Sequence, residues 1–350
     1  MWVAIIDLIP YCRTLKIALG KLVTEMLKTE KTGDLLSRSP DELNAFFKQV
    51  CQADLERLGL PDSMARWLFA DRLHARGARK VMGFQAFEGP SHLQKFIKWQ
   101  SAADRKGYFS SDLADELMAR SVASDRRVLE YHGLQMPDTA LQNVALNNTQ
   151  DYILQRAYHV PERNAIRILL DFGPGYGRMA NLAYNTQVEA DRVQGYIAIE
   201  GIPSTYFTQY AYYKGLGLKV WDYYEYLDET LSQDTIAEAI GTFDVVHLPT
   251  WRFDLVPDGV VDMVTCVQVL KEIPGDLVPY AMKQFSRVSK SSGALYIRDH
   301  LQFHNPNNMP IDILAQSQGY ALEFAPQVKD RAEIHGLPRI WRKVDPTLFL

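Results

Sequence analysis

The chain has 350 residues, of which 47% are hydrophobic and 23% charged, and this composition excludes a disordered or fibrous protein. The formal net charge is −4, so the chain lacks the excess of positive charge that is typical of nucleic-acid-binding proteins, and we expect no nucleic-acid partner. The chain has three scattered cysteines, Cys12, Cys51 and Cys266, and none of them forms a CxxC pair. This spacing argues against a disulfide framework and against a structural zinc site.

No stretch approaches the roughly 18 consecutive apolar residues that a membrane span needs, and we expect no membrane partner. The opening MWVAIIDLIP lacks the basic segment and the small-residue cleavage site of a secretory leader. We therefore expect a cytoplasmic protein. Its length fits either one large domain with additions or two domains.

Apolar residues recur three and four positions apart through much of residues 1–140, which predicts helices and no strand pair. Two starts carry capping signals, because Ser39 precedes Pro40 and Ser110 or Ser111 precedes a run with acids. We interpret this region as a lid, a substrate-recognition region or a dimerisation region. The predicted helices lie within 15–28, 39–60, 63–77, 91–107 and 110–133.

Over residues 141–350 short apolar runs alternate with helical stretches, a pattern typical of a parallel sheet covered by helices on both faces. We predict an α/β, Rossmann-like sheet of five parallel strands followed by a C-terminal antiparallel hairpin. A helix from about Thr139 to Tyr158 leads into it, and 216–222 competes with 243–249 for the third strand. The strands are predicted within 166–172, 195–201, 243–249, 261–267 and 294–300, and the hairpin within 320–324 and 338–344.

The segment DFGPGYGR comes at the end of the first predicted strand. Asp171 lies where ligands of open α/β sheets bind, and Gly173, Gly175 and Gly177 let the backbone turn tightly and approach a ligand. A dinucleotide fingerprint needs a third glycine where Arg178 stands. The spacing therefore disfavours a nicotinamide enzyme, and no phosphate loop is present either.

An acid followed by Gly-x-Gly-x-Gly resembles the first motif of the class I S-adenosylmethionine-dependent methyltransferases. The resemblance implies S-adenosylmethionine as the cofactor. Asp171 would then serve the ammonium group of the cofactor, directly or through water, while the glycines admit its amino-acid chain. Arg178 either contacts the ligand's carboxylate or is a solvated or salt-bridged surface residue.

The second predicted strand ends in Glu200. An acid at this place commonly holds the ribose hydroxyls, because a carboxylate accepts two hydrogen bonds at once; the alternative is an acid that serves only the start of the next helix. Trp251 follows the third strand and would either stack on the adenine or belong to the core. The predicted cofactor-binding residues are Asp171, Gly173, Gly175, Tyr176, Gly177, Glu200, Gly201, Trp251 and Gln268.

Within about residues 145–300 the chain is similar to the sugar O-methyltransferase family, which implies methylation of a hydroxyl group. One departure matters, because Gln268 and Val269 stand where that family carries a His-Ser pair after the fourth strand, and this removes a candidate base. The segments that carry the resemblance are 175–178, 200–203, 249–251 and 272–273.

Candidate catalytic residues follow the fourth and fifth strands. His300 is our first choice, because an unperturbed imidazole pKa near 6.5 suits proton removal at neutral pH. Glu272 and Asp299 are the other candidates, and each of the three has a purely structural alternative. His304 could join His300 as a metal ligand only on a helix, which the following proline disfavours, so we predict no metal site.

The sequence thus predicts a methyltransferase acting on a small-molecule acceptor, with a hydroxyl of a sugar or natural product as first choice. N- or C-methylation of a small metabolite stays open, because the cofactor half does not encode the acceptor. A non-catalytic, cofactor-binding partner subunit also stays open, and the departure at Gln268 favours it. A homodimer is one open option for assembly.

Overall fold

The computed structural model describes residues 34–60, 64, 86–102, 111–158, 166–184, 192–227, 231–270, 272–299, 310–325 and 337–344. The predicted helix at 15–28 and nearly all of the one at 63–77 lie outside the described residues. The same holds for His300 and His304.

A single sheet of eight strands organises the described chain, in the order β3-β4-β2-β1-β5-β6-β8-β7. The first six pair in parallel, and β8 pairs antiparallel with both β6 and β7. This confirms the predicted α/β class and the C-terminal hairpin. The strands are β1 (Ile168–Phe172), β2 (Gly195–Glu200), β3 (Val220–Asp222), β4 (Val245–Pro249), β5 (Val261–Val267), β6 (Ser289–Asp299), β7 (Tyr320–Phe324) and β8 (Leu337–Lys343).

The sheet has one parallel strand more than the five predicted. Both candidates for the third strand are strands, because Val220–Asp222 forms β3 at the sheet edge and pairs in parallel with β4. At three residues it is too short for an alternation pattern to identify it from sequence. Its last residue, Asp222, is fully buried.

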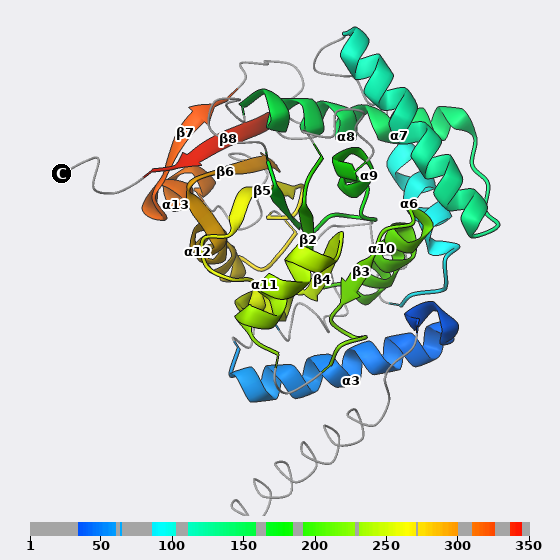
Figure 1. Cartoon of the computed structure of the whole chain (residues 1–350), viewed down its shortest axis with the longest axis horizontal. Helices are drawn as coiled ribbons and strands as arrows, with labels where there is room; N and C mark the ends of the chain where they lie inside the picture. The colour runs from blue at the N-terminus through cyan, green and yellow to red at the C-terminus, as the bar shows by residue number, and fades with distance from the viewer. Residues whose placement is uncertain are drawn as a thin grey trace, which may run out of the picture.

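Helices cover both faces of the sheet. In Figure 1, α11 and α12 lie on one side, and α8, α9 and α10 lie on the other. The predicted helix at about 139–158 is confirmed as α8. The helices are η1 (Leu35–Ser37), α3 (Pro40–Leu58), α6 (His92–Ser101), α7 (Asp112–Tyr131), α8 (Asp138–Tyr158), α9 (Met179–Tyr184), α10 (Pro203–Gly215), α11 (Gln233–Thr242), η4 (Thr250–Leu255), α12 (Leu277–Val288) and α13 (Ile311–Ser317).

The predicted capping residues begin two of the N-terminal helices. Ser39 accepts a hydrogen bond from the backbone of Glu42, whose side chain returns to Ser39, so α3 starts with a complete capping box. Ser111 accepts a hydrogen bond from the backbone N–H of Ala114 at the start of α7. Short-range side-chain chemistry therefore sets these two helix starts.

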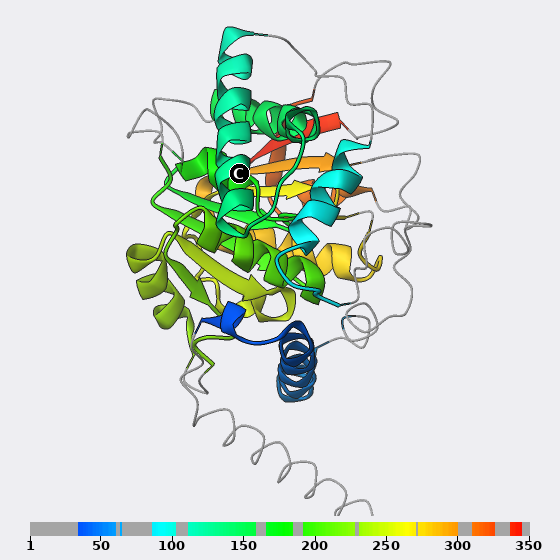
Figure 2. The same ribbon diagram turned by 90° about the vertical axis from the view of Figure 1, so that its right-hand side faces the viewer.

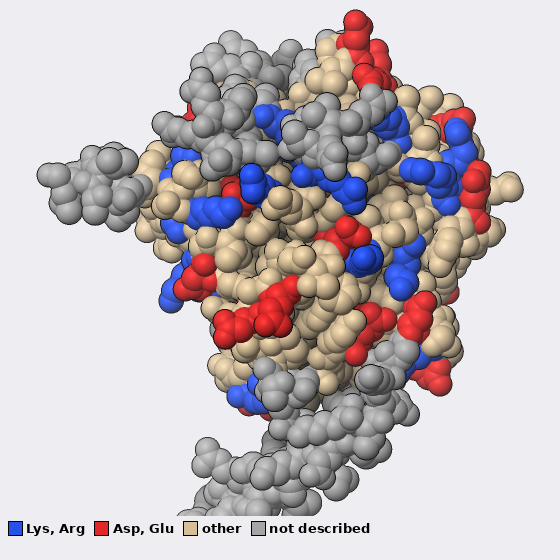
Figure 3. Space-filling view, in the orientation of Figure 1, with Lys and Arg blue, Asp and Glu red and all other residues tan. Residues whose placement is uncertain are grey.

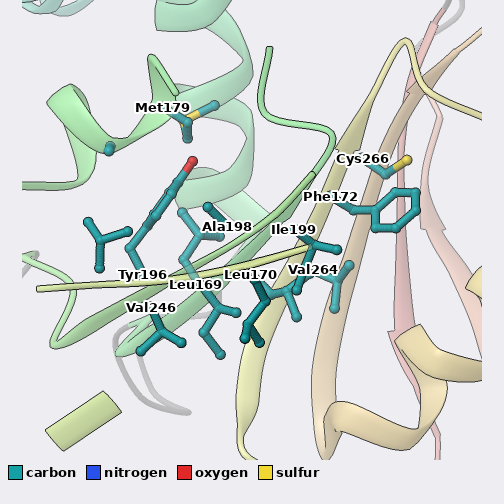
Figure 4. Close-up of a cluster of buried hydrophobic side chains, with 14 of the residues drawn as sticks. Leu169, Leu170, Phe172, Met179, Tyr196, Ala198, Ile199, Val246, Val264 and Cys266 are labelled. Carbon is teal, nitrogen blue, oxygen red and sulfur yellow. The ribbon is translucent and has the colours of Figure 1, made fainter. Parts of the chain in front are cut away.

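The core is centred on β1, which lies between β2 and β5. Figure 4 shows Leu169 and Leu170 of β1 among side chains of the neighbouring strands, including Ile199 and Val264. Because both faces of these strands are covered by helices, they have near-continuous runs of buried residues rather than alternating ones. One hydrophobic cluster reaches from Leu35 to Trp341, so the N-terminal helices share their core with the sheet.

Helix α10 lies inside the molecule. All ten of its residues from Ser204 to Tyr213 are buried, because the sheet covers one side and α3, α6 and α7 cover the other. Helix α3 contacts both η4 and α10, and Figure 1 shows it at the end of the sheet that carries β3; Figure 2 gives the view from the side. A helix enclosed on every side needs its neighbours for stability.

The surface carries charges of both signs. Figure 3 shows basic and acidic side chains spread over one face of the molecule. None of the helices in the described ranges combines the length and the apolar character that a membrane crossing requires.

The contact between α10 and α7 can be tested with two glycines that both lie in helices. At Gly215 a Cβ would lie 2.8 Å from Cγ1 of Val128, whereas at Gly241 nothing lies within 4 Å. We expect Gly241→Ala to raise the free energy of unfolding by up to about 1 kcal/mol through helix propensity, and Gly215→Ala to lower it by about 1–3 kcal/mol through overpacking. Urea denaturation measures both. Equal effects of the two substitutions would contradict the close packing of α10 on α7.

Candidate functional site

The predicted site residues that the structure describes lie at one edge of the sheet, at or just after the carboxyl ends of its parallel strands. The chain moves from β1 to β2 on one side and later returns to β5 on the other, and ligands of open α/β sheets bind at such a point of reversal. Gly173 follows β1 there and lies against Val269, which follows β5. A Cβ on Gly173 would lie 2.4 Å from Cγ2 of Val269, so only glycine fits.

The glycine turn takes a backbone conformation that favours glycine at each of its three positions. Gly173, Gly175 and Gly177 have φ angles of +69°, +61° and +90°. A Cβ at Gly175 would lie 3.7 Å from Nε2 of Gln100, which places α6 of the N-terminal region over the turn. A Cβ at Gly177 would lie 2.6 Å from the ring of Tyr213, so this glycine makes room for α10.

Asp171 is a buried acid, with 5% of its surface exposed. The hydroxyl of Tyr196 donates a hydrogen bond of 2.5 Å to its Oδ2. Burial raises the pKa of Asp171 to about 7. Within the described ranges no lysine or arginine forms an ion pair with it, so the carboxylate lacks a compensating cation there.

Glu200, the last residue of β2, is equally buried and lies three residues before the start of α10 at Pro203. Its Oε1 accepts hydrogen bonds from the backbone N–H groups of Gly201 and Ile202, at 2.8 and 2.9 Å, and its Oε2 accepts one from Nε2 of Gln209 at 2.9 Å. Burial raises its pKa to about 7, and the negative charge of Glu272 acts in the same direction. A carboxylate offers about four acceptor positions, so a position is left for an incoming hydroxyl.

Two predicted residues of the turn point into the protein instead of toward the sheet edge. The ring of Tyr176 meets those of Tyr212 and Phe96, with centroids 5.2 and 6.4 Å apart. Nε of Arg178 lies 2.9 Å from Oδ2 of Asp125 on α7. Arg178 is therefore salt-bridged, but its ion pair is buried rather than on the surface, and Tyr176 offers a ligand only its backbone.

Trp251 is the second residue after β4, which agrees with its predicted place after a strand, but α3 encloses its ring. Its Nε1 donates a hydrogen bond to Oδ2 of Asp54 at 3.0 Å, and Phe47 meets the ring edge-on at 5.2 Å. The side chain is fully buried. Its stacking on an adenine stays a prediction, and it would require α3 to move.

Gln268 follows β5 and has a φ angle of +63°, the only positive value of a non-glycine residue in the described chain. Its backbone N–H donates to the carbonyl of Arg298 at 2.9 Å, which holds it between the ends of β5 and β6. A bulky residue in this conformation carries strain, and such strain gathers at functional sites.

The three predicted catalytic residues fall in different surroundings. Glu272 is half-buried in the turn after β5 and is close enough to influence the pKa of Glu200. Asp299 ends β6 and is almost completely buried, and His300 lies outside the described residues. In the described ranges no three histidine, cysteine or acidic residues are grouped so that they could hold a metal ion.

The sequence interpretation missed the residues whose side chains hydrogen-bond to Asp171 and Glu200 inside the protein. Tyr196 lies inside β2 and contacts Asp171, and Gln209 lies inside α10 and contacts Glu200. For Tyr196 the signal is a hydroxyl-bearing residue within the otherwise apolar run of β2, because buried polar groups need partners. Gln209 lies among serine, threonine and tyrosine residues of α10, so no comparable signal marks it.

No protein-family model and no curated protein matches the sequence. Among solved structures, the chain is similar to an S-adenosylmethionine-dependent methyltransferase from Aquifex aeolicus, with 15% identity, 55% of this chain and 89% of that chain covered, and a TM-score of 0.37. A TehB-like methyltransferase from Corynebacterium glutamicum is 13% identical, with 64% of this chain and 98% of that chain covered and a TM-score of 0.37. Magnesium protoporphyrin IX methyltransferase from Synechocystis, solved with bound S-adenosylmethionine, is 13% identical, with 68% of this chain and 98% of that chain covered and a TM-score of 0.36. Scores this low carry no functional assignment, so the function is inferred below from the chain's own residues.

The raised pKa of Asp171 makes the stability of the unliganded protein depend on pH. Between the ordinary value of 3.8 and the folded value of about 7, the folded state keeps a proton that the unfolded chain releases. The free energy of unfolding should therefore fall as the pH rises through this window, by up to about 1.4 kcal/mol per pH unit for this group, and then level off.

Asp171→Asn cannot ionise and should lack this share of the pH dependence. Its stability relative to the wild type should rise by on the order of 2 kcal/mol between about pH 5 and pH 7.5. Urea denaturation across this range measures the difference, and Asp258→Asn at the exposed surface serves as the control. Parallel profiles for wild type and Asp171→Asn would contradict the raised pKa.

The strain at Gln268 predicts a gain in stability on substitution by glycine. Gln268→Gly should raise the free energy of unfolding by about 1 kcal/mol, because relief of the left-handed backbone outweighs the added freedom of the unfolded chain. Gln268→Asn, which tolerates this conformation better than most residues, should be close to wild type. Chemical denaturation measures both, and a destabilised glycine variant would show that contacts of the Gln268 side chain outweigh the strain.

Proposed function

We propose that the protein is an S-adenosylmethionine-dependent methyltransferase acting on a small-molecule acceptor. The observation that carries the proposal is the pair of buried acids, Asp171 and Glu200, at the ends of two neighbouring parallel strands beside the glycine turn. Asp171 has no cationic partner in the described chain. Burying such a carboxylate is costly unless a ligand compensates its charge.

The chemistry of S-adenosylmethionine fits these groups. Its ammonium would pair with the carboxylate of Asp171 in a charge-assisted hydrogen bond, and a ribose hydroxyl would take the acceptor position left on Glu200. Gly173 and Gly175 leave room for the amino-acid chain beside the backbone. When bound, the cofactor supplies an activated methyl group, and the protein's task is then to position the acceptor in line with it.

The proposed reaction is O-methylation of a hydroxyl in a sugar or natural product, for which a base must accept the hydroxyl proton. Glu272 lies on the cofactor edge and is not fully buried, which supports it among the three candidates. Asp299, which ends β6, and His300, which follows it in the sequence, stay candidates. N- or C-methylation of a small metabolite is the nearest alternative, because an amine or activated carbon acceptor makes a different demand on the base.

A second candidate function is a partner subunit that binds the cofactor without turnover. The apolar Val269, which occupies the space next to Gly173, favours it, because a base is absent at that position. Transfer of a labelled methyl group from the cofactor to any acceptor in a cell extract would refute this second candidate.

We also propose that the protein works in the cytoplasm and that the helices of residues 1–140 form a lid over the cofactor. The closeness of Gln100 on α6 to Gly175 supports a lid. The substrate-recognition and dimerisation roles of the same region remain proposals of equal standing.

Calorimetric titration with S-adenosylhomocysteine tests the proposed function. The intact protein should bind with a micromolar dissociation constant, and Asp171→Ala should weaken binding at least about tenfold, a loss of about 1.4 kcal/mol. Asp258→Ala, which removes an exposed acid paired with Arg287, should bind like the wild type. If the intact protein fails to bind, the proposed function is wrong.

A further inference from the structure

A chain of buried hydrogen bonds lies behind Glu200. Nδ1 of His247 is 2.8 Å from Oδ2 of Asp222, and Nε2 of His247 is 3.0 Å from Oε1 of Gln209. Nε2 of Gln209 donates to Oε2 of Glu200 at 2.9 Å and to the carbonyl of Gly175 at 2.6 Å. These hydrogen bonds thus link Asp222 on the outermost strand, β3, to Glu200 of β2 and to the glycine turn.

The donors and acceptors of this chain leave Gln209 a single orientation. The carbonyl of Gly175 can only accept a hydrogen bond, so the amide nitrogen of Gln209 must face it. The amide oxygen then faces His247, whose Nε2 must carry a proton and donate it. A rotated amide would place its oxygen against two other acceptors, Glu200 and Gly175, and would repel both.

The imidazole of His247 is held in place from several sides. The ring of Tyr206 stacks on it with centroids 3.7 Å apart and planes 15° apart, and Tyr213 meets it edge-on at 5.7 Å. Asp222 is itself fixed, because its Oδ1 accepts a hydrogen bond from the backbone N–H of Tyr224 at 2.8 Å. His247, Asp222 and Gln209 have no exposed surface, so the chain is shielded from competing water.

We propose that Gln209 is a positioning residue, held by His247 and Asp222, that turns the carboxylate of Glu200 toward the cofactor's ribose and fixes the carbonyl of Gly175. The inference rests on the proposed function and adds to it the means by which the ribose hydroxyls are recognised. Gln209 occupies one position of Oε2, and the backbone N–H groups of Gly201 and Ile202 hold Oε1. These contacts fix the orientation of the carboxylate, so the free lone pair of Oε2 points in a single direction.

The inference also assigns a purpose to the additional strand. Asp222 is the last residue of β3, the strand by which this sheet exceeds the predicted five. Without β3 the imidazole of His247 would lose its second hydrogen-bond partner. The orientation of the ring would then rest on its packing against Tyr206 and Tyr213 and on its bond to Gln209.

The test compares two ligands, S-adenosylhomocysteine and its analogue without the 2′ and 3′ hydroxyls, by calorimetric titration. The wild type should bind the complete ligand at least about tenfold more tightly, because a carboxylate set to accept a hydroxyl loses its bond with the analogue. In Gln209→Met this preference should fall toward one, because binding of the complete ligand should weaken more than binding of the analogue, which makes no ribose contact with Glu200. Thr208→Val is the matched control on the same buried helix, because among the described residues the hydroxyl of Thr208 bonds only the carbonyl of Ser204.

Asp222, at the other end of this series of hydrogen bonds, allows a conservative substitution that should preserve the ligand preference. Asp222→Asn can donate to Nδ1 of His247 and still accept from the backbone of Tyr224, so it should keep the wild-type preference. Asp222→Ala should reduce it severalfold. If Gln209→Met fails to fold, Gln209→Glu, which sets a second carboxyl against Glu200, should show the same loss, and Asp222→Ala decides if both Gln209 variants fail to fold.

The outcomes separate this inference from the proposed function. A folded Gln209→Met that keeps the wild-type preference overturns the inference and leaves the proposed function standing. A wild type that binds both ligands equally also overturns it, because Glu200 then does not recognise the ribose. A wild type that binds neither ligand overturns the proposed function and the inference together.

Discussion

The burial of helix α10 is the constraint on which the rest of the structure depends. The helix is rich in tyrosine, and three of its tyrosine hydroxyls donate hydrogen bonds to residues outside the helix. The hydroxyl of Tyr206 donates to the carbonyl of His247 in the sheet, whereas those of Tyr210 and Tyr212 donate to Glu225 and to Asp125 of α7. Because the partners lie on both sides, α10 is stable only between the sheet and the N-terminal helices.

This arrangement links the N-terminal region to the candidate site. The ion pair of Arg178 with Asp125 joins the helix after the glycine turn to α7, and the contact of Trp251 with Asp54 joins η4 to α3. Both contacts are buried, and removing one partner of a buried ion pair such as Arg178–Asp125 costs several kcal/mol. The N-terminal helices therefore help to shape the site, whatever role they have toward an acceptor.

The two buried acids of the site, Asp171 and Glu200, lower the stability of the unliganded protein. Burial raises the pKa of Asp171 and of Glu200 to about 7, which means that each carboxylate is less favourable inside the protein than in water. A ligand that brings a positive group to Asp171 and a hydroxyl to Glu200 would recover part of this loss. Proteins commonly accept such local cost at a site that serves a ligand.

The sequence by itself determined the parts of the protein that depend on local periodicity and backbone conformation. The strands around β1 could be predicted from their apolar runs, and the turn at Gly173 from residues that tolerate positive φ. The positions of Asp171 and Glu200 at strand ends followed from the same pattern, because parallel strands end at a common edge.

Only the tertiary structure decided which side chains meet across long separations in the chain. Gln209 and His247 lie 38 positions apart, and Trp251 lies 197 positions from Asp54, so no local pattern connects them. The direction of Tyr176 was also beyond sequence reasoning, and so was the finding that 216–222 and 243–249 both contain strands instead of competing for one. The physical reason is that hydrogen-bond partners of buried groups are set by the packing of whole layers, and this packing depends on every element at once.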